Sequence, residues 1–309
     1  MQSRVRKMAR RESEPLTSAG ALHAELGDDL VALLSGLPSR VVCATPITSL
    51  NARRSSRATF RIALADGSEL KARRFDSEFE AVRVARLTRH LNDPLVPAAI
   101  AQRGATLIEP WIEGRPLVAD DLAPNELHAC GALLAAIHLT SAPPGFDGEV
   151  AVARREREGR LTENLRGLLA AGRLDAEFAR RAHAAAEPVP SMPVIGLIHG
   201  DFCPENLVRT QAGRIFSVDN ETMRFEALDY DLARSWHRWP MSAVQARSFL
   251  DGYASHRSPD SFLRHFSYWA ICALVDATMF RSSAGIDGVD ALLACLDAFM
   301  REKPAFPSS

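Results

Sequence analysis

An aspartate and an asparagine lie five residues apart in the segment HGDFCPEN, at Asp201 and Asn206. Gly200 and Pro204 disfavour a continuous helix or strand there, so the segment is expected to form a loop. Thirteen residues beyond Asn206, Asp219 follows a short apolar strand pattern. Phosphoryl transfer from ATP needs Mg²⁺ held against the phosphates by oxygen ligands and a carboxylate that orients the attacking hydroxyl. Asp201, Asn206 and Asp219 have the side chains for that chemistry.

The same segments carry a family resemblance. HGDFCPEN is similar to the H-G-D-x-x-x-x-N catalytic loop of the aminoglycoside phosphotransferase and choline kinase superfamily, and VDNE followed by DYDLAR resembles its I-D-x-E…D-L-A segment. The resemblance implies that Asp201 is the catalytic base or the carboxylate that positions the nucleophile. It also implies that Asn206 and Asp219 ligate Mg²⁺ and that Glu221 helps to hold a second ion.

Two further residues of these motifs are expected to be structural. The resemblance implies that Asp231 ties the catalytic loop to the following helix and that His199 packs and forms hydrogen bonds rather than acting as a base. An H-G-D triplet alone arises by chance in many chains. The conjunction of the preceding apolar strand, the five-residue offset, the second strand ending in Asp and the D-L-A triplet makes chance a poor explanation.

Lys71 is notable because only three of the 37 basic residues are lysines. It lies on the third expected strand of the N-terminal half, where the resembling fold carries its phosphate-binding lysine, and Arg73 is the alternative. The competing interpretation is a solvated strand face that Glu69, Lys71 and Arg73 share by alternation.

The resemblance also implies a carboxylate partner for Lys71 on the next helix. We expect Glu80, which aligns with the apolar stripe of that helix, with Glu78 as the alternative. The segment LIEPWIEG at 107–114 resembles the hinge of the family, where backbone groups pair with adenine. Glu109 and Trp111 are assigned there by position alone, and a core or interface role for Trp111 remains open.

Apolar periodicity predicts strands with one main helix first, and then helices that enclose two short strands. In the first half the expected helices are 16–36 and 77–91, and the expected strands are 41–50, 58–64, 68–75, 98–102 and 106–111. In the second half the expected helices are 126–139, 153–186 and much of 232–300, and the expected strands are 194–198 and 214–218. Asp66-Gly67 is a hairpin turn signal.

This order predicts an α+β protein with the bilobal, protein-kinase-like fold that the resemblance implies. Residues 1–113 are expected to form an N-terminal nucleotide-binding lobe with a small antiparallel sheet, in which 1–15 are flexible. Residues 114–309 are expected to form a larger helical C-terminal lobe with the catalytic loop and the substrate site.

Composition narrows the class of protein. A net charge of −1 gives no global field for nucleic acid, and no apolar run approaches the length of a membrane span. The basic N-terminal stretch lacks the apolar segment of a secretory signal. Five scattered cysteines suggest neither a zinc site nor a disulfide framework, so we expect a reduced, cytoplasmic protein that is a monomer or a homodimer.

These observations together predict an ATP- and Mg²⁺-dependent kinase that phosphorylates a hydroxyl of a small molecule, such as a sugar, amino alcohol, nucleoside or antibiotic-like compound. A nucleotide-binding pseudokinase and a protein kinase are the alternatives; the chain has no G-x-G-x-x-G loop. Neither 149–187 nor 251–302 is strongly acidic, which disfavours a typical polycationic aminoglycoside. Four aromatic residues could form a cage for a quaternary amine, but core positions are expected instead for Trp236, Trp239, Tyr253 and Tyr268.

Overall fold

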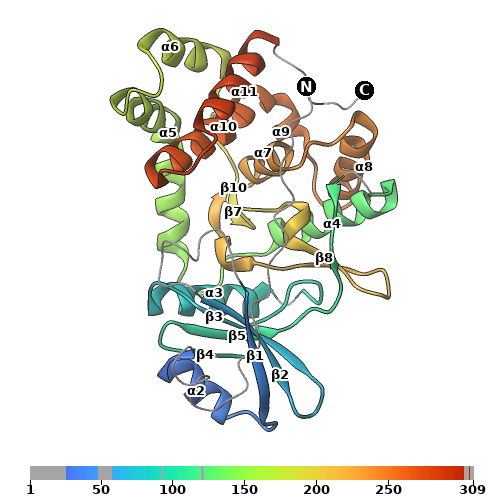
Figure 1. Ribbon diagram of the computed structural model, residues 1–309. Helices are drawn as coiled ribbons and strands as arrows, with labels where there is room; N and C mark the ends of the chain where they lie inside the picture. Colours follow the sequence, from blue (N-terminus) through green and yellow to red (C-terminus); the bar gives the residue numbers. More distant parts are fainter. Residues whose placement is uncertain (1–25, 48–57, 92, 120–121, 303–305, 307–309) are drawn as a thin grey trace. The chain divides into compact units, whose positions relative to one another are not determined.

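The computed structural model describes residues 26–47, 58–91, 93–119, 122–302 and 306. The chain divides into two compact units, Met1–Glu113 and Gly114–Ser309. Both units combine helices with antiparallel strands (Figure 1), which confirms the predicted α+β class.

The first unit contains a five-stranded antiparallel sheet in the order β1-β2-β3-β5-β4. Its strands agree with the predicted ones within a few residues, and the Asp66-Gly67 turn joins β2 to β3 with Gly67 at φ 85°. The expected helix at 16–36 and the strand at 41–50 extend outside the described residues. The described elements of this unit are α2 (Asp28–Ser35), β1 (Val41–Ile47), β2 (Ala58–Leu64), β3 (Glu69–Arg74), α3 (Glu78–Leu91), β4 (Ala101–Arg103) and β5 (Thr106–Pro110).

Helices α2 and α3 pack on opposite faces of this sheet. Leu30 of α2 belongs to one apolar cluster with Ala72 and Ile108, whereas Val84 of α3 belongs to a second cluster with Leu107. Successive residues of a strand point to opposite faces, so Leu107 and Ile108 mark the two sides. Alternation therefore puts the odd-numbered positions of β3 on the face that α3 covers.

The second unit is mainly helical. A Cβ on Gly131 of α4 would overlap the carbonyl oxygen of Phe249 in α8, so glycine allows close packing of these two helices. The expected helix at 153–186 is broken into two by a turn in which Gly172 has φ 64°. The described helices of this unit are α4 (Pro124–Leu139), α5 (Asp147–Ala170), α6 (Ala176–Ala185), α7 (Leu228–Arg238), α8 (Ala243–Ala254), α9 (Asp260–Arg264), α10 (Phe266–Ala284) and α11 (Val289–Glu302).

Short strands in the second unit support the loops that bear the motifs. The predicted strands correspond to β7 (Ile195–Ile198) and β9 (Ile215–Ser217). Three further strands were not predicted from the sequence: β6 (Arg115–Pro116), β8 (Leu207–Arg209) and β10 (Arg224–Ala227). β10 pairs antiparallel with β7, and β8 pairs with both β6 and β9. Each motif loop thus begins or ends in a hydrogen-bonded strand.

The aromatic residues considered for an amine cage are mostly core residues. Trp239 is fully buried, Tyr253 and Tyr268 are at most 5% exposed, and Trp236 packs edge-on against Phe266. The structure therefore confirms the packing interpretation. Within the described part of the chain, every helix is too short or too polar to traverse a lipid bilayer.

Candidate active site

One buried carboxylate holds the backbone of the loop that follows β7. Asp231, at the start of α7, accepts hydrogen bonds from the backbone N–H groups of His199 (2.8 Å) and Gly200 (2.9 Å). His138 of α4 lies 3.2 Å from the same carboxylate and 2.8 Å from the hydroxyl of Tyr253. Burial raises the pKa of Asp231, but the hydrogen bond and charge of His138 outweigh it, and the pKa falls below its usual value. Asp231 is thus an ionised anchor that fixes where the loop turns.

Gly200 is required at this turn. Its φ is 80°, in the left-handed region that glycine adopts without strain. A Cβ at this position would overlap the guanidinium of Arg224 and lie 2.8 Å from the carbonyl oxygen of Thr222. The Thr222 hydroxyl donates to the carbonyl of His199 at 2.7 Å, which adds a second tie to the loop. The side chain of Asp201 is therefore presented from a backbone that is fixed on both sides.

The two carboxylate oxygens of Asp201 have different partners. Asn206 Nδ2 donates to Oδ2 at 3.1 Å and to the Asp201 backbone carbonyl at 2.9 Å. Arg234 Nη2 donates to Oδ1 at 3.1 Å, and Arg238 Nη1 lies 3.7 Å from the same atom. The Asp201 side chain is 25% exposed. It can therefore meet a hydroxyl from solvent while both of its oxygens are oriented.

Asn206 and Asp219 lie at neighbouring points of one hairpin. The backbone N–H of Val218, the residue before Asp219, donates to the carbonyl of Asn206 at 2.8 Å, and β8 pairs with β9 directly beyond. Asp219 has φ 59°, the single left-handed non-glycine residue in the described part of the chain. Such strain, of order 1–3 kcal/mol, persists where the surrounding structure enforces it and is concentrated at functional sites.

The residues present fit a magnesium ion by their donor chemistry. Because Asn206 Nδ2 is used by Asp201, the amide oxygen of Asn206 remains as an acceptor, and Asp219 and Glu221 supply carboxylates. In the described residues, no three His, Cys, Asp or Glu side chains are arranged to hold a metal by themselves. This is the usual situation for Mg²⁺, which is held by one or two protein carboxylates and completes its shell with water and substrate phosphates.

His199 is a buried, neutral spacer in the loop. Its Nδ1 accepts the backbone N–H of Asp201 at 3.3 Å, and its ring packs edge-on against Phe202. Burial lowers the pKa of His199 below its usual value in spite of the nearby carboxylates. The ring therefore orients the backbone of Asp201 as an uncharged imidazole.

In the first unit, Lys71 is buried and ion-paired. Its Nζ lies 3.1 Å from Glu109 Oε1, and both residues are 6% exposed. Glu109 is opposite Lys71 in the register of β3 and β5. Arg73 is also buried, at 9% exposure, so the alternative of a solvated strand face is wrong.

Lys71 and Arg73 lie on the face of the sheet that α3 covers. A pairing of Lys71 with Glu80 or Glu78 of α3 is compatible with this placement and stays a prediction. The carboxylate of Glu109, which sequence reasoning assigned to the hinge, instead contacts Lys71.

Trp111 is half-buried, with the Arg61 guanidinium 4.8 Å from its ring centroid. Its backbone N–H donates to the carbonyl of Glu69 at 3.2 Å, within the sheet. This N–H group is therefore already used within the sheet, and an adenine contact in the segment 107–114 would involve a different backbone group. The assignment of Trp111 to a hinge stays a prediction.

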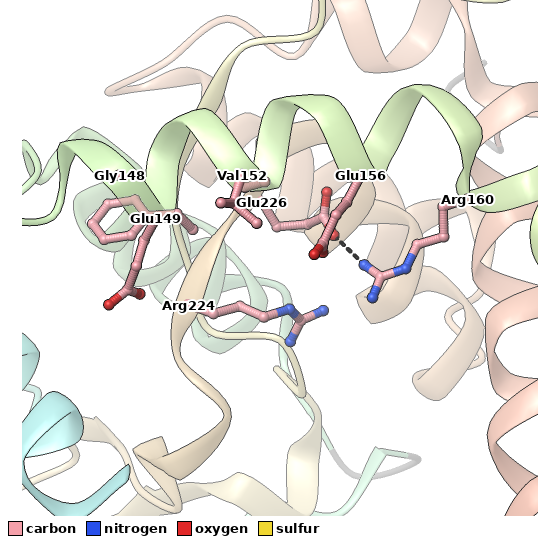
Figure 2. A pocket seen from close by; sticks show the side chains of 9 residues that line it. Gly148, Glu149, Val152, Glu156, Arg160, Arg224 and Glu226 are labelled. Atoms are coloured by element: carbon pink, nitrogen blue, oxygen red, sulfur yellow. Dashed lines mark hydrogen bonds and ion pairs between the residues drawn. The ribbon is translucent and has the colours of Figure 1, made fainter. Parts of the chain in front are cut away.

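A pocket of about 300 Å³ opens between α5 and β10 in the second unit. Figure 2 shows Glu149 and Glu156 projecting from α5, with the Arg224 side chain across from them and Arg160 bonded to Glu226. The Arg160–Glu226 pair measures 2.7 Å and neutralises the most buried carboxylate of the pocket. Because Arg224 also abuts Gly200, this pocket adjoins the loop that carries Asp201.

Sequence reasoning missed the arginines of this region. Arg234 directly follows the D-L-A triplet, and Arg238 lies four residues later, one helical turn along α7. That spacing was the available signal, since residues four apart share a helix face. Arg224 carried no signal, because its strand was not predicted.

Several solved kinases and phosphotransferases share the fold of this chain. A choline/ethanolamine kinase family protein from Mesorhizobium loti superposes with a TM-score of 0.63 at 17% identity, covering 89% of this chain and 94% of that one. A macrolide 2′-phosphotransferase from Brachybacterium faecium gives 0.57 at 18% identity, covering 78% and 88%. These likenesses confirm the predicted protein-kinase-like fold.

A further similar structure is an amicoumacin kinase solved with AMP-PNP, Ca²⁺ and Ami, at a TM-score of 0.60 and 15% identity, covering 94% of this chain and 98% of that one. No curated protein sequence matches the chain at a significant level. The profile of the phosphotransferase enzyme family, however, matches residues 47–263, more than two thirds of the sequence. The chain therefore belongs to the phosphotransferase enzyme family.

Proposed function

We propose that this phosphotransferase is an ATP- and Mg²⁺-dependent kinase that phosphorylates a hydroxyl group of a small molecule. The observation that carries the proposal is the oriented carboxylate of Asp201, with one oxygen on Asn206 and the other on Arg234. A carboxylate held in this way can accept the proton of an attacking hydroxyl. The amicoumacin kinase of similar fold, solved with AMP-PNP, supports a nucleotide as the phosphoryl donor.

Each residue has a role in this proposal. Asp201 orients the hydroxyl and receives its proton. Asn206 and Asp219, with Glu221, hold Mg²⁺, which supplies charge neutralisation for the phosphates when it is bound. Lys71, with its charge oriented by Glu109, contacts the phosphates of the nucleotide.

The pocket between α5 and β10 is proposed to hold the body of the acceptor, because Arg224 at its edge touches the turn before Asp201. The helical unit, residues 114–309, thus supplies the acceptor site and the catalytic loop. The sheet unit, residues 1–113, supplies the nucleotide contacts.

The experiment is phosphorylation of a library of small hydroxyl compounds with Mg·ATP, read by mass shift. The proposal predicts a gain of one phosphoryl group on at least one class of acceptor, and loss of this product in Asp201→Asn. Binding of nucleotide without transfer to any acceptor would instead favour a pseudokinase. Transfer to peptide hydroxyls alone would favour a protein kinase.

A further inference from the structure

The catalytic carboxylate separates two chemically different sides of the site. Oδ2 of Asp201 faces Asn206, one of the proposed metal ligands, whereas Oδ1 faces α7. On the α7 side, the guanidinium groups of Arg234 and Arg238 approach the same oxygen at 3.1 and 3.7 Å. The arginines therefore contact the carboxylate oxygen that Asn206 does not contact, and an acceptor whose hydroxyl reaches Asp201 comes close to them.

These positive charges exceed the negative charge available to them. In the part of the chain that the structure describes, Asp201 is the one carboxylate within ion-pair distance of Arg234 or Arg238. The neighbouring acids are already used: Asp231 by backbone N–H groups and His138, and Glu226 by Arg160. Two guanidinium groups thus share a single carboxylate.

Arg238 has guanidinium N–H donors that are available to a ligand. It is 38% exposed, and its described polar contacts are both long: 3.7 Å to Asp201 and 3.5 Å to Cys203 Sγ. A guanidinium has five N–H donors in a planar fork that matches the oxygens of a carboxylate or phosphate. Arg238 can therefore receive such a group from solvent without giving up a strong bond.

A nearby histidine responds to the same charges. His237 lies between the two arginines in the sequence, and its pKa is lowered to about 4, by burial first and then by the charges of Arg234, Arg238 and Arg281. A further positive charge is therefore disfavoured beside α7. Arg224, at the turn before Asp201, adds a further guanidinium on the pocket side.

We propose that the acceptor carries an anionic group, a carboxylate or a phosphate, close to the hydroxyl that is phosphorylated, and that Arg238 together with Arg234 binds it. The inference rests on the proposed kinase function and names the substrate class of that same site. Glu149 and Glu156 of α5 line the pocket, so an additional ammonium elsewhere in the acceptor is compatible. A cationic acceptor without an acidic group, such as a simple amino alcohol, is not.

Binding is tested with three probes of similar size that differ in charge: glycerate, glycerol and ethanolamine, each titrated into the full chain with Mg·AMP-PNP and read by thermal shift and NMR line broadening. We expect glycerate to bind in preference to the other two. We expect Arg238→Gln to weaken glycerate binding about tenfold, a difference of about 1.4 kcal/mol, and Arg238→Lys to restore part of it. 3-Phosphoglycerate in the same titration distinguishes a phosphate site from a carboxylate site.

Arg180→Gln is the matched control, because Arg180 is exposed on α6 and pairs with its neighbour Glu177. It should bind glycerate as the wild type does. Equal or better binding of ethanolamine, or glycerate binding that is unchanged in Arg238→Gln, would overturn the proposal.

Measurements of turnover distinguish a failure of this inference from a failure of the proposed kinase function. With the best acceptor of the library, Arg238→Gln should raise KM for the acceptor and leave KM for ATP unchanged. A fall in kcat for every acceptor at constant KM would instead mean that the arginines act on the transferred phosphoryl group, and would refute the acceptor assignment. If no acceptor is phosphorylated but glycerate binds through Arg238, the kinase proposal fails and the anion site remains.

Discussion

Asp231 Oδ1 accepts a 2.9 Å hydrogen bond from the backbone N–H of Gly200, and its other oxygen accepts one from His199. One fully buried carboxylate therefore holds the loop that presents Asp201. Removing a partner from such a buried charged network commonly costs about 3 kcal/mol or more. We predict that Asp231→Asn lowers the free energy of unfolding by about 2–4 kcal/mol, since the amide keeps only one acceptor oxygen. Urea unfolding at pH 7 measures the loss.

The same residue gives a pH dependence with a defined sign. The pKa of Asp231 is lowered in the folded protein, so its carboxylate stabilises the fold above the unfolded value of about 3.9. This contribution is lost as the pH falls below that value towards the folded pKa. The gap in unfolding free energy between wild type and Asp231→Asn should therefore be constant from pH 7 to 5 and narrow below about pH 4. A difference in unfolding free energy that increases at low pH would contradict the assignment of Asp231 as an ionised anchor of the loop.

Gly200→Ala tests the turn before the catalytic aspartate. The added methyl meets the Arg224 guanidinium and the Thr222 carbonyl, and overpacking of this kind costs about 1–3 kcal/mol beyond the strain of a positive φ. Gly213→Ala is the matched control, because Gly213 has φ 76° and no neighbour within 4 Å of an added Cβ. We expect Gly200→Ala to lose turnover more than tenfold. Gly213→Ala should lose only about 1 kcal/mol of stability and keep turnover. Equal effects of the two changes, measured by unfolding and by product formation, would argue against a fixed loop.

Much of the catalytic loop could be predicted because its determinants are local. Asp201 and Asn206 lie within six consecutive residues, and glycine and proline mark the turn between two apolar strands. The pairing of Lys71 with Glu109 could not be predicted in this way. It depends on the register of two strands that are far apart in the sequence, and register is set by side-chain packing across the whole sheet.

The arginines were missed for a related reason. Arginine is the common cation of this chain, so composition does not distinguish Arg234 or Arg238 from a solvated residue. Only the position of α7 relative to the loop gives these side chains a partner in Asp201. Sequence motifs thus predicted the reacting carboxylate, whereas its electrostatic surroundings required the fold.

Glu109→Gln tests the nucleotide contact assigned to Lys71. The substitution keeps the shape of the side chain and removes the charge that orients the buried ammonium group, 3.1 Å away. We expect Mg·ATP to bind about tenfold more weakly, as measured by isothermal titration calorimetry. Lys71→Met should weaken it further.

Glu69→Gln supplies the control for that change. Glu69 lies on β3, the strand that carries Lys71, and pairs with Arg61 at 2.7 Å, but the side chains of Glu69 and Arg61 are both more than a quarter exposed. Such pairs contribute about 0–1 kcal/mol, so nucleotide binding should stay close to that of the wild type. If Glu69→Gln weakens binding as much as Glu109→Gln does, the effect belongs to the sheet as a whole and not to Lys71.

Asp201 and Asp219 have separate roles in the proposed reaction, one in proton transfer and the other in Mg²⁺ binding. Paired measurements of nucleotide binding and of turnover in Asp201→Asn and Asp219→Asn distinguish these roles. Asp201→Asn should bind Mg·AMP-PNP nearly as the wild type does and lose about 10²–10⁴-fold in turnover, the usual contribution of a general base. Asp219→Asn should lose the part of nucleotide binding that depends on Mg²⁺. Wild-type turnover in Asp201→Asn, or unchanged Mg²⁺-dependent binding in Asp219→Asn, would refute these separate roles.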